Sequence, residues 1–324
     1  MFIPTYTIAI PVYERMLGFT EALNAALAVE GCTQVLVVDD KSSHDDFKIA
    51  CEAVKNTKVR YVKNVENAGL FANWNNCIAL SDSDFISILC SDDFIESNAY
   101  TLFLEAYKVQ NNIDVFFGSF VTFTTTVKKN QVHRTYKEGP VKAVDLLADT
   151  IHNGPAFPVL SIMRRATMLK YPFVAKPHSG NDWLWIYSNA SALNLYATSK
   201  TINYWRVHAE QDAVVSKSIT MDCWPLMYQQ MALQLNSIDK GLALKATRKA
   251  KGLLLFWLLD GYVKDKAWQK KIILKDENPN IFVASMRQLI KEDWLLSKLL
   301  TNRTPNYLLY ITGKIMSKTP YYLL

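Results

Sequence analysis

Two pairs of adjacent carboxylates stand at the ends of apolar runs in this 324-residue sequence. Asp39-Asp40 follows the run 34–38, and Asp92-Asp93 follows the run 85–91. Two carboxylates held this close repel each other unless a cation or hydrogen bonds neutralise them. A hard divalent ion such as Mg²⁺ or Mn²⁺, shared with substrate phosphates, is the usual solution. The structural alternative for Asp92-Asp93 is a cap for a helix that begins at Phe94.

Alternating strands and helices are predicted around these acids, over residues 7–107. Short apolar runs at 7–12, 34–38 and 85–90 predict buried strands, and residues 59–63 predict a further strand. The amphipathic segments between them predict helices. Strict alternation is the pattern of a parallel sheet with right-handed crossovers, covered by helices on both faces. Ligands of such sheets bind beyond the carboxyl ends of the strands, so both acid pairs should lie at the functional edge.

The chemistry of that edge favours one class of ligand. An anionic ligand there needs a metal ion, whereas a nucleoside uses carboxylates as acceptors for its base N–H and ribose hydroxyls. Both properties fit a nucleoside diphosphate. The sequence has no GxGxxG after its first strand and no GxxxxGK[ST] motif, so neither a dinucleotide site nor a P-loop is predicted.

Five segments, in the right order, carry a family resemblance that extends from about Thr7 to Gln211. They are Ile10-Pro11-Val12-Tyr13-Glu14, Val38-Asp39-Asp40-Lys41-Ser42-Ser43, Asn67-Ala68-Gly69-Leu70 with Asn73, Ser91-Asp92-Asp93, and Asn181-Asp182-Trp183. Together they resemble the inverting glycosyltransferases of family 2, and Arg206-Val-His208-Ala-Glu-Gln211 is similar to a further element of that family. The resemblance implies the GT-A fold, an α/β architecture with a Rossmann-like, mostly parallel sheet flanked by helices. It also implies a small mixed sheet and a helical C-terminal region.

The resemblance assigns the chemistry to three residues. Asp182 is implied to be the general base, and Asp93 with His208 is implied to hold the cofactor, Mn²⁺ or Mg²⁺. An imidazole ligand suits Mn²⁺ better than Mg²⁺. Two positions depart from the family pattern, because Cys90 replaces a frequent Asp and Asn181 replaces the frequent Glu before the base. The predicted metal site therefore contains fewer acids than is common in the family.

The resemblance also implies a set of nucleotide-binding residues. Asp40, or its neighbour Asp39, would accept from the N3–H of a pyrimidine, and Asp92 would bind the ribose. Arg206 is a candidate partner of the diphosphate. The full predicted set is Pro11, Tyr13, Glu14, Asp39, Asp40, Asn67, Gly69, Asn73, Ser91, Asp92 and Arg206.

The middle of the chain is predicted to border the acceptor. Alternating residues at 114–123 predict strands of a small mixed sheet beside the main one. A turn-rich segment, 152–158, precedes a predicted strand at 159–164, and by the resemblance it borders the acceptor pocket. The candidate acceptor-binding residues are therefore His152, Asn153 and Phe157.

The chain then changes character, which predicts two domains, 1–218 and 219–324. Helices dominate the second, including 281–300 and a tail to Leu324. Basic residues lie beside Leu and Trp in segments such as 249–257, and helices of that composition suit the anionic surface of a membrane. In the alternative interpretation, the apolar stripes pack on one another.

Composition bounds the class and the location of the protein. Half of the residues are hydrophobic and a fifth are charged, with a net charge of +6, which excludes a disordered chain. Five cysteines without a CxxC pair indicate reduced thiols. No secretory signal is predicted, and no apolar run approaches the roughly 20 residues of a membrane span. We expect a cytoplasmic protein, peripheral on the inner membrane if its C-terminal helices bind lipid.

We therefore hypothesise an inverting, metal-dependent glycosyltransferase, a hexosyl- or N-acetylhexosaminyltransferase of bacterial surface polysaccharide or lipopolysaccharide synthesis. Its predicted donor is a UDP-sugar, with a dTDP-sugar second, and its acceptor is a glycan or lipid-linked oligosaccharide. Two alternatives stay open: a nucleotidyltransferase, for which residues 11–14 supply no Gly-rich phosphate loop, and a non-catalytic sugar-nucleotide-binding protein. Nucleic-acid binding is not predicted, because the basic residues are dispersed.

Overall fold

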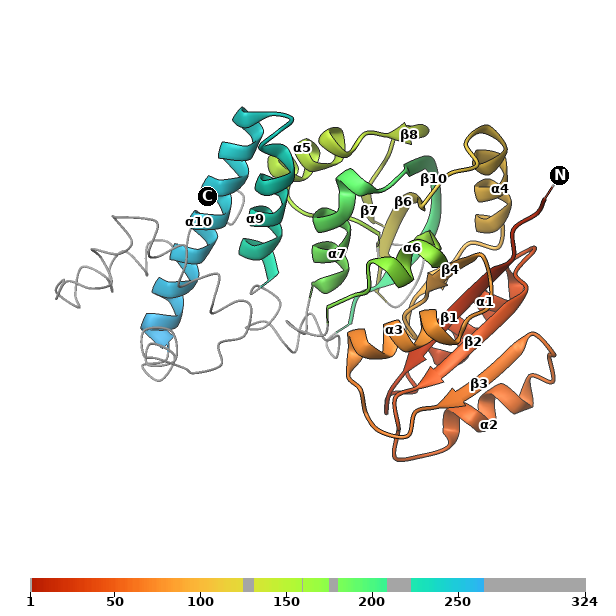
Figure 1. The fold of residues 1–324 in the computed structure, drawn as a ribbon. Helices are drawn as coiled ribbons and strands as arrows, with labels where there is room; N and C mark the ends of the chain where they lie inside the picture. Colours follow the sequence, from red (N-terminus) through yellow and green to blue (C-terminus); the bar gives the residue numbers. More distant parts are fainter. Residues whose placement is uncertain (1, 125–130, 159, 175–179, 209–222, 265–324) are drawn as a thin grey trace. The chain divides into compact units, whose positions relative to one another are not determined.

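The computed structural model describes residues 2–124, 131–158, 160–174, 180–208 and 223–264 (Figure 1). The chain divides into two compact units. Unit 1 comprises Met1–Leu146, Ala156–Ala175 and Asn189–Val215, and unit 2 comprises Leu147–Pro155, Lys176–Ser188 and Ser216–Leu324. Unit 2 thus includes two segments that precede residue 219 in the sequence. The predicted helix at 281–300 and the tail that follows it lie outside the described residues.

Unit 1 begins with strands and helices in strict alternation, as predicted. In order they are β1 (Tyr6–Val12), α1 (Phe19–Ala28), β2 (Gln34–Asp39), α2 (Asp46–Ala53), β3 (Val59–Lys63), α3 (Leu70–Leu80) and β4 (Phe85–Ile88). β1 pairs in parallel with β2 and with β4, and β2 pairs in parallel with β3. Every residue of β1 and β4 is buried, because both faces of a parallel sheet are covered, and this explains their apolar composition.

The remaining strands extend the same sheet. The elements are β5 (Phe94–Ile95), α4 (Ala99–Val109), β6 (Val115–Phe123), β7 (Gln131–Arg134), β8 (Gly139–Val141), α5 (Ala143–Asn153), β9 (Ile162–Arg164), α6 (Arg165–Lys170) and β10 (Leu195–Arg206). Within the described residues the sheet has ten strands in the order β3-β2-β1-β4-β9-β6-β10-β5, with β7 beside β6 and β8 beside β10. The predicted α/β class is confirmed.

Strand pairing corrects two details of the prediction. A separate small mixed sheet is absent from the described part of the chain, because β9 pairs antiparallel with both β4 and β6 and so joins the later strands to the main sheet. The helix that was the structural alternative at Phe94 is also wrong, since Phe94 and Ile95 form β5, antiparallel to β10. The next helix starts at Ala99, so Asp92-Asp93 caps no helix.

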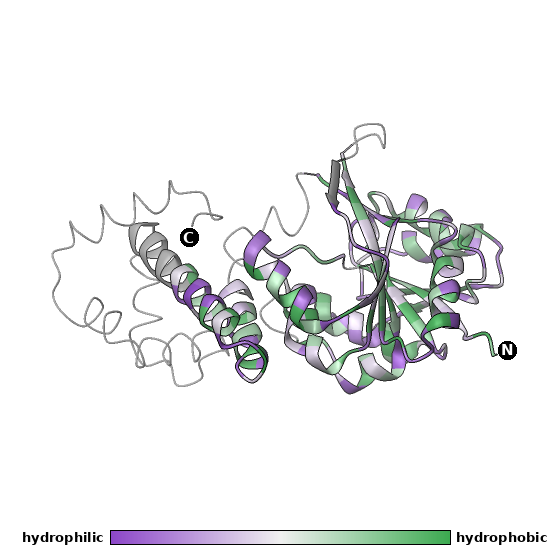
Figure 2. Cartoon of the chain, turned by 90° about the horizontal axis from the view of Figure 1, so that it is seen from above, coloured by the Kyte–Doolittle hydropathy of each residue, from purple (hydrophilic) through white to green (hydrophobic). Residues whose placement is uncertain are grey.

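Aromatic side chains link the sheet to α4. Tyr6 of β1 stacks on Tyr100 with 4.8 Å between ring centroids, and Phe85 of β4 lies 4.6 Å from Phe103. Figure 2 shows hydrophilic and hydrophobic residues side by side along the helices, as expected for helices that cover a sheet with one face only. The core of unit 1 is therefore anchored on the central parallel strands.

Unit 2 contains α7 (Asn181–Asn189), α9 (Cys223–Leu235) and α10 (Lys240–Lys264), and the short 3₁₀ helix η2 (Ala190–Ala192) follows α7. α10 packs on α9. The buried stripe of α10 consists of Ala243, Ala246, Ala250 and Leu253. For this helix pair, the apolar stripe packs within the protein. No helix in the described ranges is long and apolar enough to cross a membrane.

A buried polar chain joins the parallel half of the sheet to the segment before β9. The Tyr6 hydroxyl donates to Ser87 Oγ at 2.7 Å, and the Ser87 hydroxyl donates to the Ser161 carbonyl at 2.8 Å. All three residues are buried. Because a buried hydroxyl without an acceptor is unfavourable, the middle serine holds both neighbours in place.

The variant Ser87→Ala should lower the free energy of unfolding by about 1–3 kcal/mol, because it leaves the Tyr6 hydroxyl buried without an acceptor. The double variant Tyr6→Phe with Ser87→Ala should recover part of that loss, since no hydroxyl is then stranded. Urea denaturation measures both, with the exposed Ser97→Ala as the control. Additive losses in the double variant would contradict the coupling.

Candidate active site

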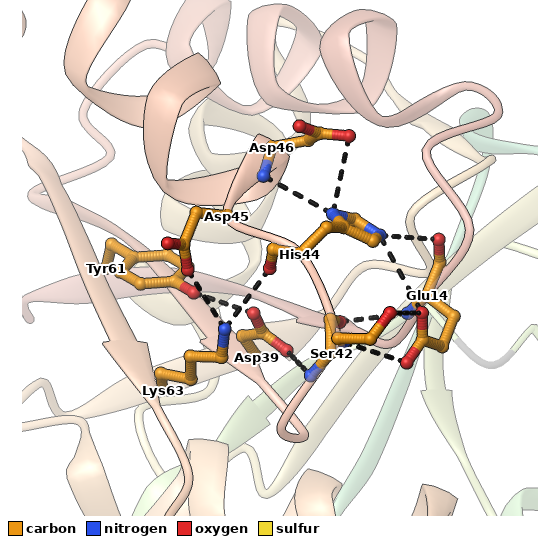
Figure 3. Close-up of polar contacts among 9 residues, drawn as sticks. Glu14, Asp39, Ser42, His44, Asp45, Asp46, Tyr61 and Lys63 are labelled. Carbon is orange, nitrogen blue, oxygen red and sulfur yellow. Dashed lines mark hydrogen bonds and ion pairs between the residues drawn. The ribbon is translucent and has the colours of Figure 1, made fainter.

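The first acid pair lies at the tip of β2, and Asp39 is committed to the local fold. Asp39 Oδ1 accepts a hydrogen bond from the Ser42 amide at 2.7 Å, and Oδ2 accepts one from the Tyr61 hydroxyl at 2.6 Å (Figure 3). Burial, followed by this carboxylate, raises the pKa of Tyr61, so its hydroxyl remains a donor. Asp39 therefore holds the turn after β2 and links it to β3.

Asp40 anchors the loop that connects β3 to α3. Its Oδ1 accepts hydrogen bonds from Asn64 Nδ2 at 2.8 Å and from the Ala68 amide at 2.9 Å, and its Oδ2 accepts one from the Gly69 amide at 2.8 Å. Gly69 has φ 87° and ψ 161°, a conformation that is essentially restricted to glycine. Three donors from one loop thus neutralise a carboxylate that the family resemblance predicts to bind the pyrimidine, and that role stays a prediction.

Asn73 completes this network from α3. Its Oδ1 accepts a hydrogen bond from Asn64 Nδ2 at 2.9 Å, and its Nδ2 donates to the Val38 carbonyl at 3.0 Å. The side chain is buried. Asn73 and Gly69 therefore lie in one hydrogen-bonded cluster with Asp40, as the sequence predicts for a shared site, and they fix the loop beside the tip of β2.

Glu14 closes the loop after β1 onto the loop after β2 (Figure 3). Its amide donates to Ser42 Oγ at 2.9 Å, and its carboxylate accepts from both the amide and the hydroxyl of Ser43 at 2.9 Å. Its carbonyl accepts from His44 Nε2 at 2.8 Å. The backbone of Glu14 has φ 55°, a left-handed conformation that these contacts hold in place.

Four other predicted nucleotide residues differ in exposure. Pro11 is buried in β1, opposite Val38 of β2. Tyr13 is 52% exposed, so its ring is accessible to a planar ligand. Asn67 is exposed, and Ser91 is half-buried beside the second acid pair. Their nucleotide-binding roles stay predictions.

The second acid pair, between β4 and β5, is the most strongly charged part of the site. Both carboxylates are buried. Asp92 Oδ2 lies 2.8 Å from His208 Nε2 and 3.2 Å from an Arg15 guanidinium nitrogen. Asp93 Oδ1 accepts a hydrogen bond from the Arg206 amide at 2.9 Å. Burial, and then the charge of Asp92, raises the pKa of Asp93 well above its usual range, so this carboxylate would gain from a nearby cation.

Cys90 occupies the position at which the resemblance implies a further acid, so the charge repulsion between Asp92 and Asp93 is not increased by a third carboxylate. Its thiol hydrogen-bonds with Asp93, which acts to lower the pKa of that carboxyl. A third carboxylate at the same place would act in the opposite direction. The departure from the family pattern therefore reduces the number of charges without removing a polar contact from Asp93.

Arg206, the predicted diphosphate partner, is held within the protein. Its guanidinium lies 5.1 Å from the ring centroid of Phe94 and 5.0 Å from that of Phe123. Its Nε donates to the Asp92 carbonyl at 2.9 Å, and its terminal nitrogen pairs with Glu21. These contacts give Arg206 a positioning role at the end of β10. Sequence reasoning missed Arg15, although its place directly after Tyr13-Glu14 in the first loop was a usable signal.

The side chains around the second acid pair fit a divalent ion bound together with phosphate. Within the described ranges, no three His, Cys, Asp or Glu side chains converge to form a metal site from protein alone. His208 contacts Asp92 rather than Asp93. Mg²⁺ and similar ions are commonly held by one or two carboxylates together with substrate phosphates. Asp92, Asp93 and His208 supply donors of that kind, and the raised pKa of Asp93 shows that a counter-charge is favoured there.

Asp182, the predicted base, lies in unit 2 in the first turn of α7. Gly180, two residues before Asp182, has φ 71°. Burial raises the pKa of Asp182 to about 6, against the opposing effect of hydrogen bonds from its own amide and that of Trp183. A carboxylate with this pKa is ionised at neutral pH and still accepts a proton readily, which suits a general base.

The candidate acceptor residues lie near the end of α5 and after it. His152 Nδ1 donates to the Ala148 carbonyl at 2.8 Å, and Asn153 Nδ2 donates to Asp149 Oδ1 at 2.6 Å. Phe157 is buried, 4.8 Å from the ring centroid of Phe117. Phe157 thus contributes to the core of unit 1. The acceptor roles of all three stay predictions.

A mostly parallel sheet with buried acids at the tips of β2 and β4 is the arrangement expected of the GT-A fold. The family model described as Glycosyl transferase family 2 matches residues 7–170, so the chain belongs to that family. The predicted family is confirmed.

Solved structures share this fold. The structure of S. aureus TarS 1-349 in complex with UDP-GlcNAc is 17% identical with a TM-score of 0.59, over 98% of this chain and 89% of that one. The mannosyltransferase PcManGT from Pyrobaculum calidifontis, in complex with GDP-Man and Mn²⁺, is 12% identical with a TM-score of 0.53, over 99% and 83%. No curated protein sequence matches the chain. At these identities the likeness shows the fold alone.

The variant Asp40→Asn should lower the free energy of unfolding by about 2–4 kcal/mol, because an amide NH₂ would replace an oxygen that accepts from the loop. The amides of Ala68 and Gly69 should lose protection from hydrogen exchange. The control is Asp82→Asn, which changes an exposed carboxylate and should leave both measurements unchanged. Unchanged protection in Asp40→Asn would show that the loop does not depend on this anchor.

Proposed function

We propose that the protein transfers a sugar from a nucleoside-diphosphate sugar to a hydroxyl of a glycan or lipid-linked acceptor, with inversion. The proposed donor is a UDP-sugar, with a dTDP-sugar second, and the proposed context is bacterial surface polysaccharide synthesis. The observation that carries the proposal is the buried pair Asp92-Asp93 at the tip of β4, in a chain of glycosyl transferase family 2. Structural relatives bound to UDP-GlcNAc and to GDP-Man with Mn²⁺ support it.

The donor would bind over the tips of β1, β2 and β4. Asp93 and His208 would hold Mn²⁺ or Mg²⁺, with Asp92 beside them. When bound, the ion supplies Lewis-acid stabilisation of the leaving diphosphate. The exposed Tyr13 would stack on the nucleobase of the donor. Asp39 would hold the turn after β2, and Asp40 would hold the loop between β3 and α3.

Asp182 would act as the base. As the acceptor oxygen bonds to the anomeric carbon, the bond from that carbon to the diphosphate oxygen breaks on the opposite face. The hydroxyl proton passes to the Asp182 carboxylate. One displacement inverts the configuration, and no covalent intermediate with the enzyme is formed. Its pKa of about 6 leaves the carboxylate ready to accept that proton at neutral pH.

Association with the cytoplasmic face of the inner membrane is part of the proposal. The exposed and half-buried cations of α10 are Lys240, Lys245, Arg248, Lys249 and Lys251. No acid occurs in this stretch, which would favour an anionic surface. Lys249 lies over the ring of Tyr228 of α9, at 5.6 Å from its centroid, whereas Lys240, Lys245 and Arg248 are exposed and would be the cations that meet a membrane surface.

The proposed activity is tested by measuring nucleotide release from UDP-, dTDP- and GDP-sugars, with Mn²⁺, with Mg²⁺ and with EDTA. We expect UDP release that EDTA abolishes and Mn²⁺ restores. Asp93→Asn should lose the response to added metal. Pyrophosphate release from a nucleoside triphosphate and a sugar phosphate would instead indicate a nucleotidyltransferase, and binding without turnover would indicate a non-catalytic binder.

The variant Asp182→Asn should lower kcat by about 10²–10⁴-fold with little change in UDP affinity, because only the proton acceptor is lost. In the wild type, activity should fall as pH drops below about 6, as this carboxylate becomes protonated. The matched control is Asp145→Asn, an exposed acid in the first turn of α5. Loss of UDP binding, or retained turnover, would contradict the role of Asp182 as base.

The raised pKa of Asp182 predicts that the free energy of unfolding falls as pH rises. The folded protein holds the Asp182 proton more tightly than the unfolded chain, so this carboxyl destabilises the fold increasingly as pH rises from about 4 to 6. Asp182→Asn should therefore melt at a higher temperature than the wild type at pH 8, and this gain should vanish at pH 4. A variant that melts lower at pH 8 would contradict this sign.

A further inference from the structure

The loop between β1 and α1 packs closely against Asp92. Gly18 ends this loop with φ 80°, and a Cβ added there would lie 2.9 Å from the Asp92 Cα. Only glycine permits this approach. From the same loop, the Arg15 guanidinium lies 3.2 Å from Asp92 Oδ2. The loop therefore delivers a cation to the second acid pair at short range.

Arg15 contacts the carboxylate that lies beside the proposed metal ligands, Asp93 and His208. Asp92 Oδ2 is also the oxygen that lies 2.8 Å from His208 Nε2. A guanidinium is always protonated, so Arg15 is a permanent positive charge on this carboxylate. A divalent ion held by Asp93 and His208, next to this oxygen, would repel the guanidinium. Arg15 and the ion are thus competing counter-charges for Asp92.

Arg15 and Arg206 differ in how they are enclosed. Arg206 lies between two aromatic rings and is 14% exposed, whereas the Arg15 side chain is 31% exposed. Arg15 is therefore more accessible to a ligand from solvent than Arg206 is. Its planar fork of N–H donors matches the oxygens of a phosphate.

We propose that Arg15 neutralises Asp92 before the divalent ion binds and pairs with the donor diphosphate once the ion has bound. This inference rests on the proposed function. Without a nucleotide, an ion that displaces Arg15 leaves the guanidinium without its carboxylate. With a diphosphate present, the displaced guanidinium gains a new anionic partner. Arg15 therefore makes ion binding and donor binding depend on each other.

The test measures Mn²⁺ binding to the full chain by electron paramagnetic resonance, with and without UDP. Wild type should bind Mn²⁺ weakly alone and more tightly with UDP. In the absence of UDP, Arg15→Gln should bind Mn²⁺ about tenfold more tightly than wild type, because the competing charge is gone. In the presence of UDP, the variant should bind Mn²⁺ less tightly than wild type does. The enhancement of Mn²⁺ affinity by UDP should therefore shrink by tenfold or more.

Two further variants separate charge from structure. Arg15→Lys keeps the positive charge but loses the planar guanidinium. This variant should therefore bind Mn²⁺ as weakly as wild type does in the absence of UDP. Arg60→Gln is the matched control, because Arg60 is an exposed residue of the edge strand β3 and its guanidinium donates to the Leu80 carbonyl, away from the acid pair. It should leave the enhancement unchanged.

The outcomes are distinguishable from a failure of the proposed function. Wild type that binds neither Mn²⁺ nor UDP would overturn both. Wild type that shows the enhancement, together with Arg15→Gln that shows the same enhancement or weaker Mn²⁺ binding without UDP, would overturn only this inference. Circular dichroism and melting curves establish that each variant is folded. If Arg15→Gln does not fold, Arg15→Lys still decides, because Mn²⁺ binding stronger than in the wild type would contradict competition by charge.

Discussion

The structure around the site depends on one constraint, the burial of two adjacent carboxylates at the tip of β4. Asp92 and Asp93 are both buried, and together they bind partners from distant parts of the chain. Arg15 arrives from the loop after β1, and Arg206 and His208 arrive from the end of β10. A buried charge is tolerated only when it is paired or hydrogen-bonded. This requirement holds the first loop, the β4–β5 turn and the end of β10 together.

The acids at the tip of β2 solve the same problem with hydrogen bonds. Asp39 and Asp40 accept from backbone amides and from the side chains of Tyr61 and Asn64. They are thereby neutralised within the protein and organise the loops that flank the proposed nucleotide site. The two pairs look alike in sequence, yet only Asp92-Asp93 combines short contacts to charged side chains with a strongly raised pKa of one member. The hydrogen-bond donors around each pair, rather than its residue type, distinguish the loop anchors Asp39 and Asp40 from the proposed ion site at Asp92-Asp93.

The parts of the fold that were predictable are those with local causes. Alternation of apolar runs and amphipathic segments correctly predicted the strands β1 to β4 and their parallel pairing. Burial on both faces accounts for the apolar composition of β1, β2 and β4. The helix proposed at Phe94 and the separate mixed sheet failed for the opposite reason. Both depend on pairing with β9 and β10, strands distant in sequence whose register no local pattern encodes.

The sequence by itself determined the family, the α/β class and the acid pairs at the strand tips, since each is written in short contiguous motifs. Only the tertiary structure decided that Asp40 anchors the loop at Gly69, that Arg206 is enclosed between Phe94 and Phe123, and that Arg15 faces Asp92. These are contacts between segments separated by tens to more than a hundred residues. The partner of a charge depends on which chain segments packing brings within a few ångströms, and a linear pattern does not contain that information.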